Sequence, residues 1–218
     1  MLKGIKNKNI LAGALIILVL LLIIFLPSSK KQPESREEAK KEEIYKTQDY
    51  EPIFDRKNKD SPESVTPDNL IDKIILEITG GDSETFCSTK EDGTKYNLND
   101  REGYKDKSIY LDLNSDGADE IIIEPIEVCG FIIRGASGNG PFYIFQKEGE
   151  EWVKIGELNG NLIRVSKEKT NGYFKINTNY HLSAKSGFDT FYEYVPDENE
   201  AGLGSYIEVF RSDYDNAE

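Results

Sequence analysis

The spacing of apolar residues changes several times along the chain, and the first pattern is an uninterrupted apolar run at residues 10–26. This run contains no charged or hydrogen-bonding side chain. At about 1.5 Å of rise per residue, a helix of this length reaches across most of a hydrocarbon core. No small-residue cleavage site follows it, and no cysteine near its end is placed to accept a lipid. We therefore predict a transmembrane signal anchor at 10–26, with residues 1–9 in the cytoplasm; the alternative is a cleaved signal peptide.

Residues 27–64 lose this apolar character and are rich in Lys, Glu, Asp, Ser and Pro. Such a composition buries too little apolar surface to fold by itself, so the segment is predicted to be a charged flexible linker. Within it, residues 34–46 carry oppositely charged side chains four positions apart, a spacing that supports a transient helix. The linker would hold the following domain, residues 65–218, away from the membrane surface.

A helical pattern begins near residue 66. Thr66 is a capping type of residue, Pro67 suits a first helical position, and Gly80 with Gly81 suits a left-handed helix end. Between them, apolar residues recur at steps of one and three, which places them on one face of a helix. We expect this face to pack against a sheet. Its residues are Leu70, Ile71, Ile74, Ile75 and Ile78.

From residue 108 onward the pattern changes to short runs rich in β-branched and aromatic residues, separated by turn formers. The glycine-bearing connections at 147–150, 159–160 and 171–172 are typical of turns between antiparallel neighbours, and Asn159 with Gly160 is the strongest hairpin signal. The predicted fold class is therefore α+β, mostly an antiparallel β meander with one packed N-terminal helix. The predicted strands are 108–112, 119–124, 128–133, 141–147, 151–158, 161–167, 172–181, 188–195 and 205–211.

Oxygen-bearing side chains alternate in the stretch that joins the first two predicted strands. Asp112, Asn114, Asp116 and Glu120 stand at positions 1, 3, 5 and 9 of this stretch, and a glycine follows the third of them. Ca²⁺ binds about six to eight oxygens, and alternate residues of a tight loop can face one centre. An EF-hand is excluded because position 12 holds Ile123 in place of a bidentate Glu. The alternative is a polar hairpin turn without an ion, since the same residue types are ordinary turn formers.

This stretch resembles the Asp-x-Asn-x-Asp-Gly-x-x-Glu calcium loops of FG-GAP and integrin-like β-blades, and of exported bacterial β-domains in which the loop runs directly into a strand. The resemblance extends over about residues 108–195, through the glycine-rich stretch 135–140 and the turn 170–173. It implies a bound Ca²⁺ in an exported domain, and it implies no specific activity. The ligands it implies are the side chains of Asp112, Asn114, Asp116 and Glu120 and the backbone carbonyl of Ala118.

The chain carries a formal net charge of −13, and residues 1–29 contain no acid, so the remainder is more acidic still. An acidic surface repels nucleic-acid phosphates, and we therefore expect no nucleic-acid partner. Cys87 and Cys129 both lie in the domain 65–218, where they either form a disulfide or stay as separate buried thiols. Long C-terminal domains are translocated regardless of charge, and millimolar calcium is found outside cells, so we place this domain outside the membrane.

Residues suited to catalysis are scarce. His181 is the only histidine, and its sequence neighbours supply no nucleophile arrangement. The stretch 135–140 lacks the Lys and Ser/Thr of a phosphate-binding P-loop. The sequence therefore favours a single-pass cell-membrane protein whose outer domain has a structural Ca²⁺ site and acts, without catalysis, as a binding or adhesion module for a protein or glycan of the cell envelope. Two alternatives stay open: an envelope hydrolase that uses acidic residues around 135–140, and an accessory or inhibitory protein of a wall enzyme.

Overall fold

The computed structural model divides the chain into two compact units, residues 1–40 and 41–218, and the fold described below is that of the second. The predicted membrane segment 10–26 lies outside the described residues. Among the residues that are described, no helix has both the length and the apolar composition needed to cross a bilayer. The described residues are 36–46, 48–54, 66–81, 87, 90, 92–96, 102–197 and 203–215.

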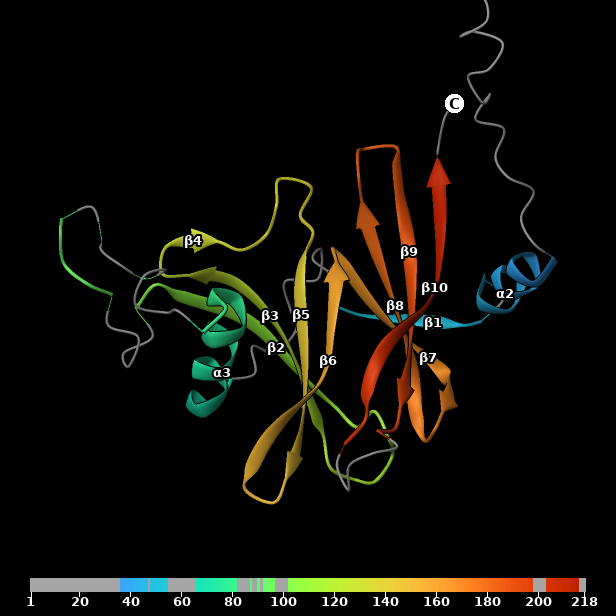
Figure 1. Cartoon of the computed structure of the whole chain (residues 1–218), viewed down its shortest axis with the longest axis horizontal. Coiled ribbons are helices and arrows are strands. Elements are labelled where there is room, and N and C mark those ends of the chain that lie inside the picture. The colour runs from blue at the N-terminus through green and yellow to red at the C-terminus, as the bar shows by residue number, and fades with distance from the viewer. Residues whose placement is uncertain are drawn as a thin grey trace, which may run out of the picture. The chain divides into compact units, whose positions relative to one another are not determined.

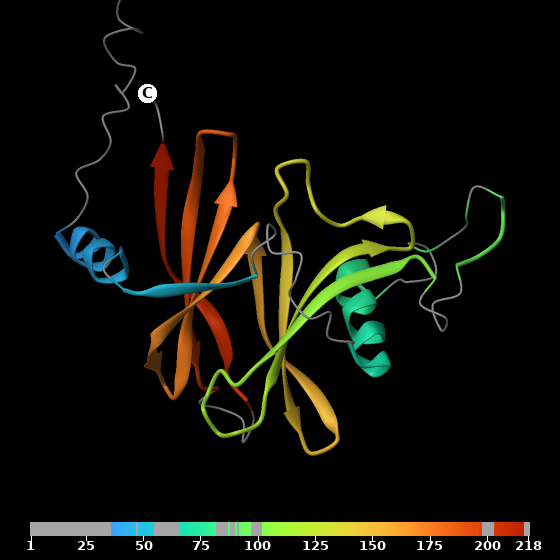
Figure 2. The same ribbon diagram turned by 180° about the vertical axis from the view of Figure 1, so that it is seen from behind.

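The described strands form two antiparallel sheets (Figures 1 and 2). Sheet A has the strand order β1-β7-β8-β9-β10, and sheet B has the order β2-β3-β5-β6, with β4 paired to β3. The elements are α2 (Arg36–Lys46), β1 (Tyr50–Phe54), α3 (Asp68–Thr79), β2 (Tyr104–Leu111), β3 (Glu120–Val128), β4 (Phe131–Ile132), β5 (Gly140–Glu148), β6 (Glu151–Gly160), β7 (Leu162–Thr170), β8 (Tyr173–His181), β9 (Ser186–Val195) and β10 (Ser205–Asp215).

The main core lies between the two sheets. Alternate residues along each strand point to the same face, so the strands of each sheet present their apolar side chains to the other sheet. A fully buried side chain of this kind stabilises the fold by about 1.5–3 kcal/mol. The core residues are Ile122, Phe142, Ile144, Ile155 and Leu158 of sheet B and Ile163, Val165, Ile176, Tyr192, Tyr194 and Tyr206 of sheet A.

Helix α3 covers the opposite face of sheet B and forms a second core there (Figure 1). The predicted apolar stripe is confirmed, because its first four members are buried and Ile78 packs against them partly buried. This core joins the buried helix residues Leu70, Ile71, Ile74 and Ile75 to Tyr104, Ile121, Ile123, Val128, Tyr143, Phe145 and Trp152 of sheet B.

The structure confirms the predicted C-terminal end of α3 but not its predicted N-terminal cap. Gly80 ends the helix in the left-handed conformation, with φ of 64°, as predicted. At the start, Pro67 occupies the capping position and no side chain caps the helix, so the predicted Thr66 cap is wrong. The Thr66 hydroxyl instead donates a hydrogen bond to the Asp106 carboxylate of β2. An anionic acceptor on the neighbouring sheet thus takes this hydroxyl, which ties the start of the helix to sheet B.

The face of sheet A that points away from sheet B carries a small aromatic cluster around α2. The Tyr45 ring centroid lies 5.1 Å from that of Phe191 and 5.5 Å from that of Phe210, and its hydroxyl donates to Glu193 at 2.9 Å. Strand β1, which follows α2, pairs with the edge strand β7. Strand β1 lies within residues 27–64, whose polar composition predicts a linker. The local composition gives no signal for this strand, because the edge strand with which it pairs is more than a hundred residues away in sequence.

The prediction of a mostly antiparallel β domain is confirmed, but the meander is divided between two sheets. The predicted hairpin at Asn159 with Gly160 is wrong, since β6 pairs with β5, whereas β7 pairs with β1 and β8. The chain crosses from one sheet to the other at this point. A Cβ on Gly160 would lie 2.6 Å from the Asn179 carbonyl oxygen, and the Asn161 N–H donates to that oxygen at 2.7 Å. The glycine serves a close approach here and not a tight turn.

The other two glycine-bearing connections do join antiparallel neighbours. β5 and β6 are paired up to Glu148 and Glu151, on either side of the turn at 149–150. Asn171 and Gly172 have φ of 52° and 88° between β7 and β8, the left-handed pair that a two-residue hairpin turn needs. The predicted strand 128–133 is interrupted, because a turn separates β3 from β4.

Candidate metal centre

The candidate metal centre is the loop that joins β2 to β3. Leu111 and Glu120 are the last paired residues of this hairpin, so residues 112–119 form the connection. Leu113 is fully buried in the core between the sheets and anchors the loop. Its polar neighbours are thereby held at the edge of that core.

The Asp112 carboxylate organises the backbone of the loop. One oxygen, Oδ1, accepts the N–H groups of Ser115 at 2.6 Å and Asp116 at 3.2 Å, and Oδ2 accepts the N–H of Gly117 at 3.0 Å. Gly117 has φ of 89°, which a residue without a Cβ adopts easily. Because three successive N–H groups bond to one side chain, the backbone curls around it.

The other predicted ligands meet within this curl. Asn114 Oδ1 accepts the Asp116 N–H at 2.8 Å, and Asp116 Oδ1 accepts the Ala118 N–H at 2.7 Å. The Asn114 side-chain amide donates to Asp116 Oδ2 at 2.8 Å and to Glu120 Oε1 at 3.3 Å. One amide thus bridges two carboxylates, which places Asn114, Asp116 and Glu120 side by side.

Glu120 is the buried member of the set, with 1% of its surface exposed. The pKa of its carboxyl is raised from 4.5 to about 7, chiefly by burial and to a smaller extent by the nearby carboxylates of Asp116 and Asp112. The Leu113 N–H, which donates to Glu120 Oε2 at 2.6 Å, acts in the opposite direction. A buried carboxyl beside two other acids is stabilised either by a proton or by a cation.

The donor set fits a hard cation, since its side-chain atoms are three carboxylates and one amide oxygen. Across the described part of the chain, no three His, Cys, Asp or Glu side chains lie together in the arrangement of a bound metal. Instead, the Asn114 amide occupies the space between two acids, donating N–H groups where a ligand would present its oxygen. Coordination by all four side chains would require this amide to turn. The assignment of Asp112, Asn114, Asp116, Glu120 and the Ala118 carbonyl to Ca²⁺ stays a prediction.

The loop belongs to sheet B but is also bonded to sheet A. Lys169 Nζ of β7 donates to the Asn114 carbonyl and to Ser115 Oγ, both at 2.6 Å. The Phe174 N–H of β8 donates to the Leu113 carbonyl at 2.9 Å. The loop therefore connects the two sheets at the end where the β7–β8 hairpin turns.

Two contributors to this connection are absent from the predicted site, Lys169 and Tyr173. The Tyr173 hydroxyl donates to Gln146 of β5 and lies 3.4 Å from the Asn114 amide nitrogen. Its ring stacks on that of Tyr194 with centroids 3.8 Å apart. A signal existed in the sequence, because the turn 170–173 is one of the stretches that carry the resemblance, but it does not say that this turn meets the loop.

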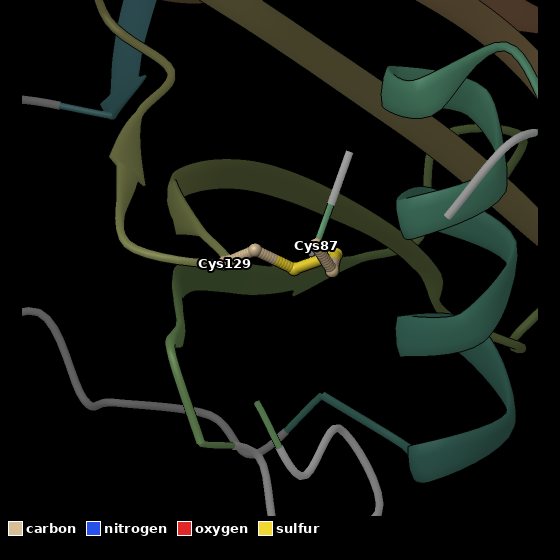
Figure 3. The surroundings of a disulfide bond; sticks show 2 residues. All are labelled: Cys87 and Cys129. Carbon is tan, nitrogen blue, oxygen red and sulfur yellow. A yellow bond between two sulfur atoms is a disulfide. The ribbon is translucent and has the colours of Figure 1, made fainter. Parts of the chain in front are cut away.

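A disulfide joins Cys87 to Cys129, which decides between the two states that the sequence leaves open (Figure 3). The bond links residues 42 positions apart and is part of the core between α3 and sheet B. Cytosolic thiols are kept reduced, so this disulfide suggests an extracytoplasmic domain. It also ties the segment after α3 to the end of β3.

The glycine-rich stretch 135–140 is held by a neutral side chain. The Asn139 amide donates to Ser137 Oγ and to the His181 carbonyl, both at 2.7 Å, and its oxygen accepts the His181 N–H at 2.9 Å. The buried acid near this stretch, Glu124, forms an ion pair with Arg134. His181 thus contributes its backbone to the structure of this loop.

Comparison of the chain with protein-family models, with curated proteins and with solved structures finds no match.

Proposed function

We propose that this protein is a membrane-anchored cell-surface protein whose extracytoplasmic β domain is stabilised by Ca²⁺ and acts as a non-catalytic binding or adhesion module. The observation that carries the proposal is the Asp112 carboxylate, which accepts three successive backbone N–H groups and so preforms the loop. A loop that is curled in advance loses less conformational entropy when an ion binds.

The role of the ion would be structural. The loop places the carboxylates of Asp116 and Asp112 near enough to Glu120 to raise its pKa, and a divalent cation would offset this repulsion. The same loop bonds to Lys169 and Phe174 of sheet A. Calcium would thus strengthen the connection between the two sheets, and Asp112, Asn114, Asp116 and Glu120 with the Ala118 carbonyl would hold it.

The location follows from two further features. The disulfide between Cys87 and Cys129 fits an oxidising compartment. The apolar run 10–26 fits a single membrane-spanning anchor that leaves the domain on the outer side. A protein or glycan of the cell envelope is the partner class that such a location supplies.

The test is a calcium titration by calorimetry on the full-length chain, purified in a mild detergent and stripped of metal. We expect saturable one-to-one binding in the micromolar to millimolar range, together with a rise in melting temperature. The variant Asp116→Ala should bind no calcium. Asp119→Ala is the matched control, because Asp119 is an exposed acid of the same loop outside the predicted ligand set, and it should bind like the wild type. Absence of binding by the wild type, or equal loss in both variants, would sink the calcium assignment.

A further inference from the structure

A second group of polar residues lies on sheet A, on the face that points away from sheet B. Strand pairing places Arg164 of β7 opposite Asn177 of β8, and Asn179 of β8 opposite Asp189 of β9. Their neighbours in sequence, such as Ile176, point into the core, so these four side chains share the outer face. Tyr214 of β10 borders them, and its hydroxyl donates to Asn179 Oδ1 at 3.4 Å. We refer to these five residues as the polar patch of sheet A.

Hydrogen bonds fix the side chains of the polar patch relative to one another. Arg164 Nη1 donates to Asn177 Oδ1 at 2.7 Å, and the Asn177 amide donates in turn to the Thr190 carbonyl at 3.2 Å. The Asn179 amide donates to Asp189 Oδ1 at 3.0 Å. Each planar group is therefore held in one orientation before any ligand arrives.

The composition of the polar patch opposes the local structure. Asn and Asp are depleted in strands, yet Asn177, Asn179 and Asp189 stand on the central strand of sheet A and on its neighbour. Asn177 is buried and its hydrogen bonds tie β7 to β9, but Asn179 and Asp189 are partly exposed, and a β-branched residue would suit those two strand positions better. Local rules broken without an evident structural gain are expected where a protein has a functional site.

The patch combines a fixed base with an accessible rim. Asn177 is 2% exposed, whereas the side chains of Arg164 and Asp189 are 30% and 34% exposed. Farther along the same face, Tyr45 of α2 covers Phe191 and Phe210. The helix thus covers the aromatic part of this face, while the rim of the polar part stays open to solvent.

The chemistry of the patch selects among ligand classes. Arg164 and Asp189, 3.5 Å apart, offset each other's charge, so the patch offers no net charge to an ion. An anionic ligand would also meet a protein with a net charge of −13. A hydroxyl both donates and accepts hydrogen bonds. Two neighbouring hydroxyls of a sugar can therefore form a pair of hydrogen bonds with one planar amide, carboxylate or guanidinium group. The Tyr214 ring adds an apolar surface at the edge of the patch.

We propose that the polar patch of sheet A binds a neutral carbohydrate. Arg164 and Asn179 donate hydrogen bonds to its hydroxyls, Asp189 accepts from them, and Tyr214 packs against its C–H face, while the buried Asn177 holds Arg164 in place. The inference deepens the proposed function, because it names the partner class of the binding module. It involves different residues from the calcium loop, so each proposal can fail without the other.

The first experiment screens the full-length chain, in mild detergent with calcium, against immobilised linear oligomers of glucose, mannose, galactose and N-acetylglucosamine, with sulfated and sialylated oligosaccharides beside them. At least one neutral oligomer should bind, and calorimetry then gives its affinity. Absence of binding to every neutral oligomer, or binding confined to the anionic ones, would overturn the proposal.

The second experiment separates binding from folding with Asn179→Thr. This variant loses the amide that would contact the sugar but gains a residue that strands favour, so binding should weaken about tenfold while the melting temperature is unchanged or higher. The control is Lys167→Ala, an exposed change on β7 of the same sheet, which should bind like the wild type. Unchanged binding by Asn179→Thr, or a lower melting temperature that marks Asn179 as structural, would overturn the proposal. Calcium titration of the same variant should match the wild type.

Discussion

Two loops of the domain are candidate sites from the sequence, and they differ in the side chains that hold them: charged carboxylates in one and a neutral amide in the other. The loop 112–120 places the carboxylates of Asp116 and Glu120 around the Asn114 amide, and the pKa of the buried Glu120 is raised to about 7, chiefly by burial. The stretch 135–140 is held by a neutral amide, Asn139, whose polar atoms bond to Ser137 and to the backbone of His181. The first loop keeps an excess of negative charge that a cation would remove, whereas in the second the polar atoms of the Asn139 side chain all bond within the protein.

This difference shows that a glycine-rich loop and an acid-rich loop need separate tests of function. Hydrogen bonds alone can complete a loop of neutral groups, and such a loop depends on no ligand. Carboxylates close together repel one another even when each accepts hydrogen bonds, so their loop depends on protons or cations in solution. Calcium and pH should therefore act on the loop 112–120 and leave 135–140 unaffected.

The largest effect is expected for Asp112→Ala. The change leaves three backbone N–H groups without their acceptor and removes a predicted calcium ligand, so the free energy of unfolding in calcium should fall by about 3 kcal/mol. Thermal unfolding with calcium and with a chelator measures it. The variant should lose the calcium-induced rise in melting temperature. A rise as large as that of the wild type would show that calcium does not act through Asp112.

The corresponding change in the other loop is Asn139→Ala. It removes bonds to the backbone N–H and carbonyl of His181, and the free energy of unfolding should fall by about 2 kcal/mol. Denaturant unfolding should give the same loss with calcium and with a chelator. Ser137→Ala is the control, since it removes one bond to Asn139 and should cost clearly less. A calcium-dependent loss in Asn139→Ala would show that the two loops are coupled.

A pH series on metal-free protein should distinguish the loops by a smaller effect. The pKa of Glu120 is raised from 4.5 in the unfolded chain to about 7 in the folded domain, so the folded state holds a proton that the unfolded state releases. This contribution is fully present below about pH 4.5 and is lost as the pH rises through about 7. From pH 5 to 8, metal-free protein should therefore lose on the order of 2 kcal/mol, as followed by chemical denaturation.

Two comparisons check this assignment. Glu120→Gln should remove the pH dependence, because its amide does not titrate in this range. With calcium the sign should reverse, since protons compete with the ion for the carboxylate and calcium affinity should rise with pH. A wild-type protein without calcium that gains stability between pH 5 and 8 in this step would contradict the raised pKa of Glu120.

The smallest effect is expected for Lys169→Met. It removes two hydrogen bonds from β7 to the loop and should lower the free energy of unfolding in a chelator by about 1 kcal/mol. In calcium the loss should shrink, because the ion would hold the loop by itself. Lys167→Met is the matched control on the same strand, since that ammonium pairs with Asp49 and Glu51. Equal losses for the two variants in both conditions would remove Lys169 from the connection between the sheets.

The sequence predicts those parts of the fold that neighbouring residues decide. The buried face of α3, its end at Gly80 and the turn at Asn171 with Gly172 each depend on backbone preferences or spacing within a few residues. The curled backbone of the loop 112–120 belongs to the same group, because the hydrogen bonds within the loop link residues at most seven positions apart. These features can be read without knowing the rest of the molecule.

The same kind of signal misleads where distant residues compete. Asn159 with Gly160 has the composition of a hairpin turn, but the following strand gains more by pairing with β1 and β8 in the other sheet. Strand β1 carries no marked pattern and forms because β7 offers it an edge. Strand partners are chosen by packing over the whole sheet, which local composition does not record.

The sequence by itself therefore determined the mostly antiparallel β class, the position of α3 and the spacing of oxygen atoms in the loop 112–120, since each follows from periodicity or local turn chemistry. Only the tertiary structure decided the division into two sheets, the pairing of Cys87 with Cys129, the contact of Lys169 with the loop and the outward polar patch of sheet A. Each of these joins residues from separate elements, and packing of the whole domain decides which of them meet.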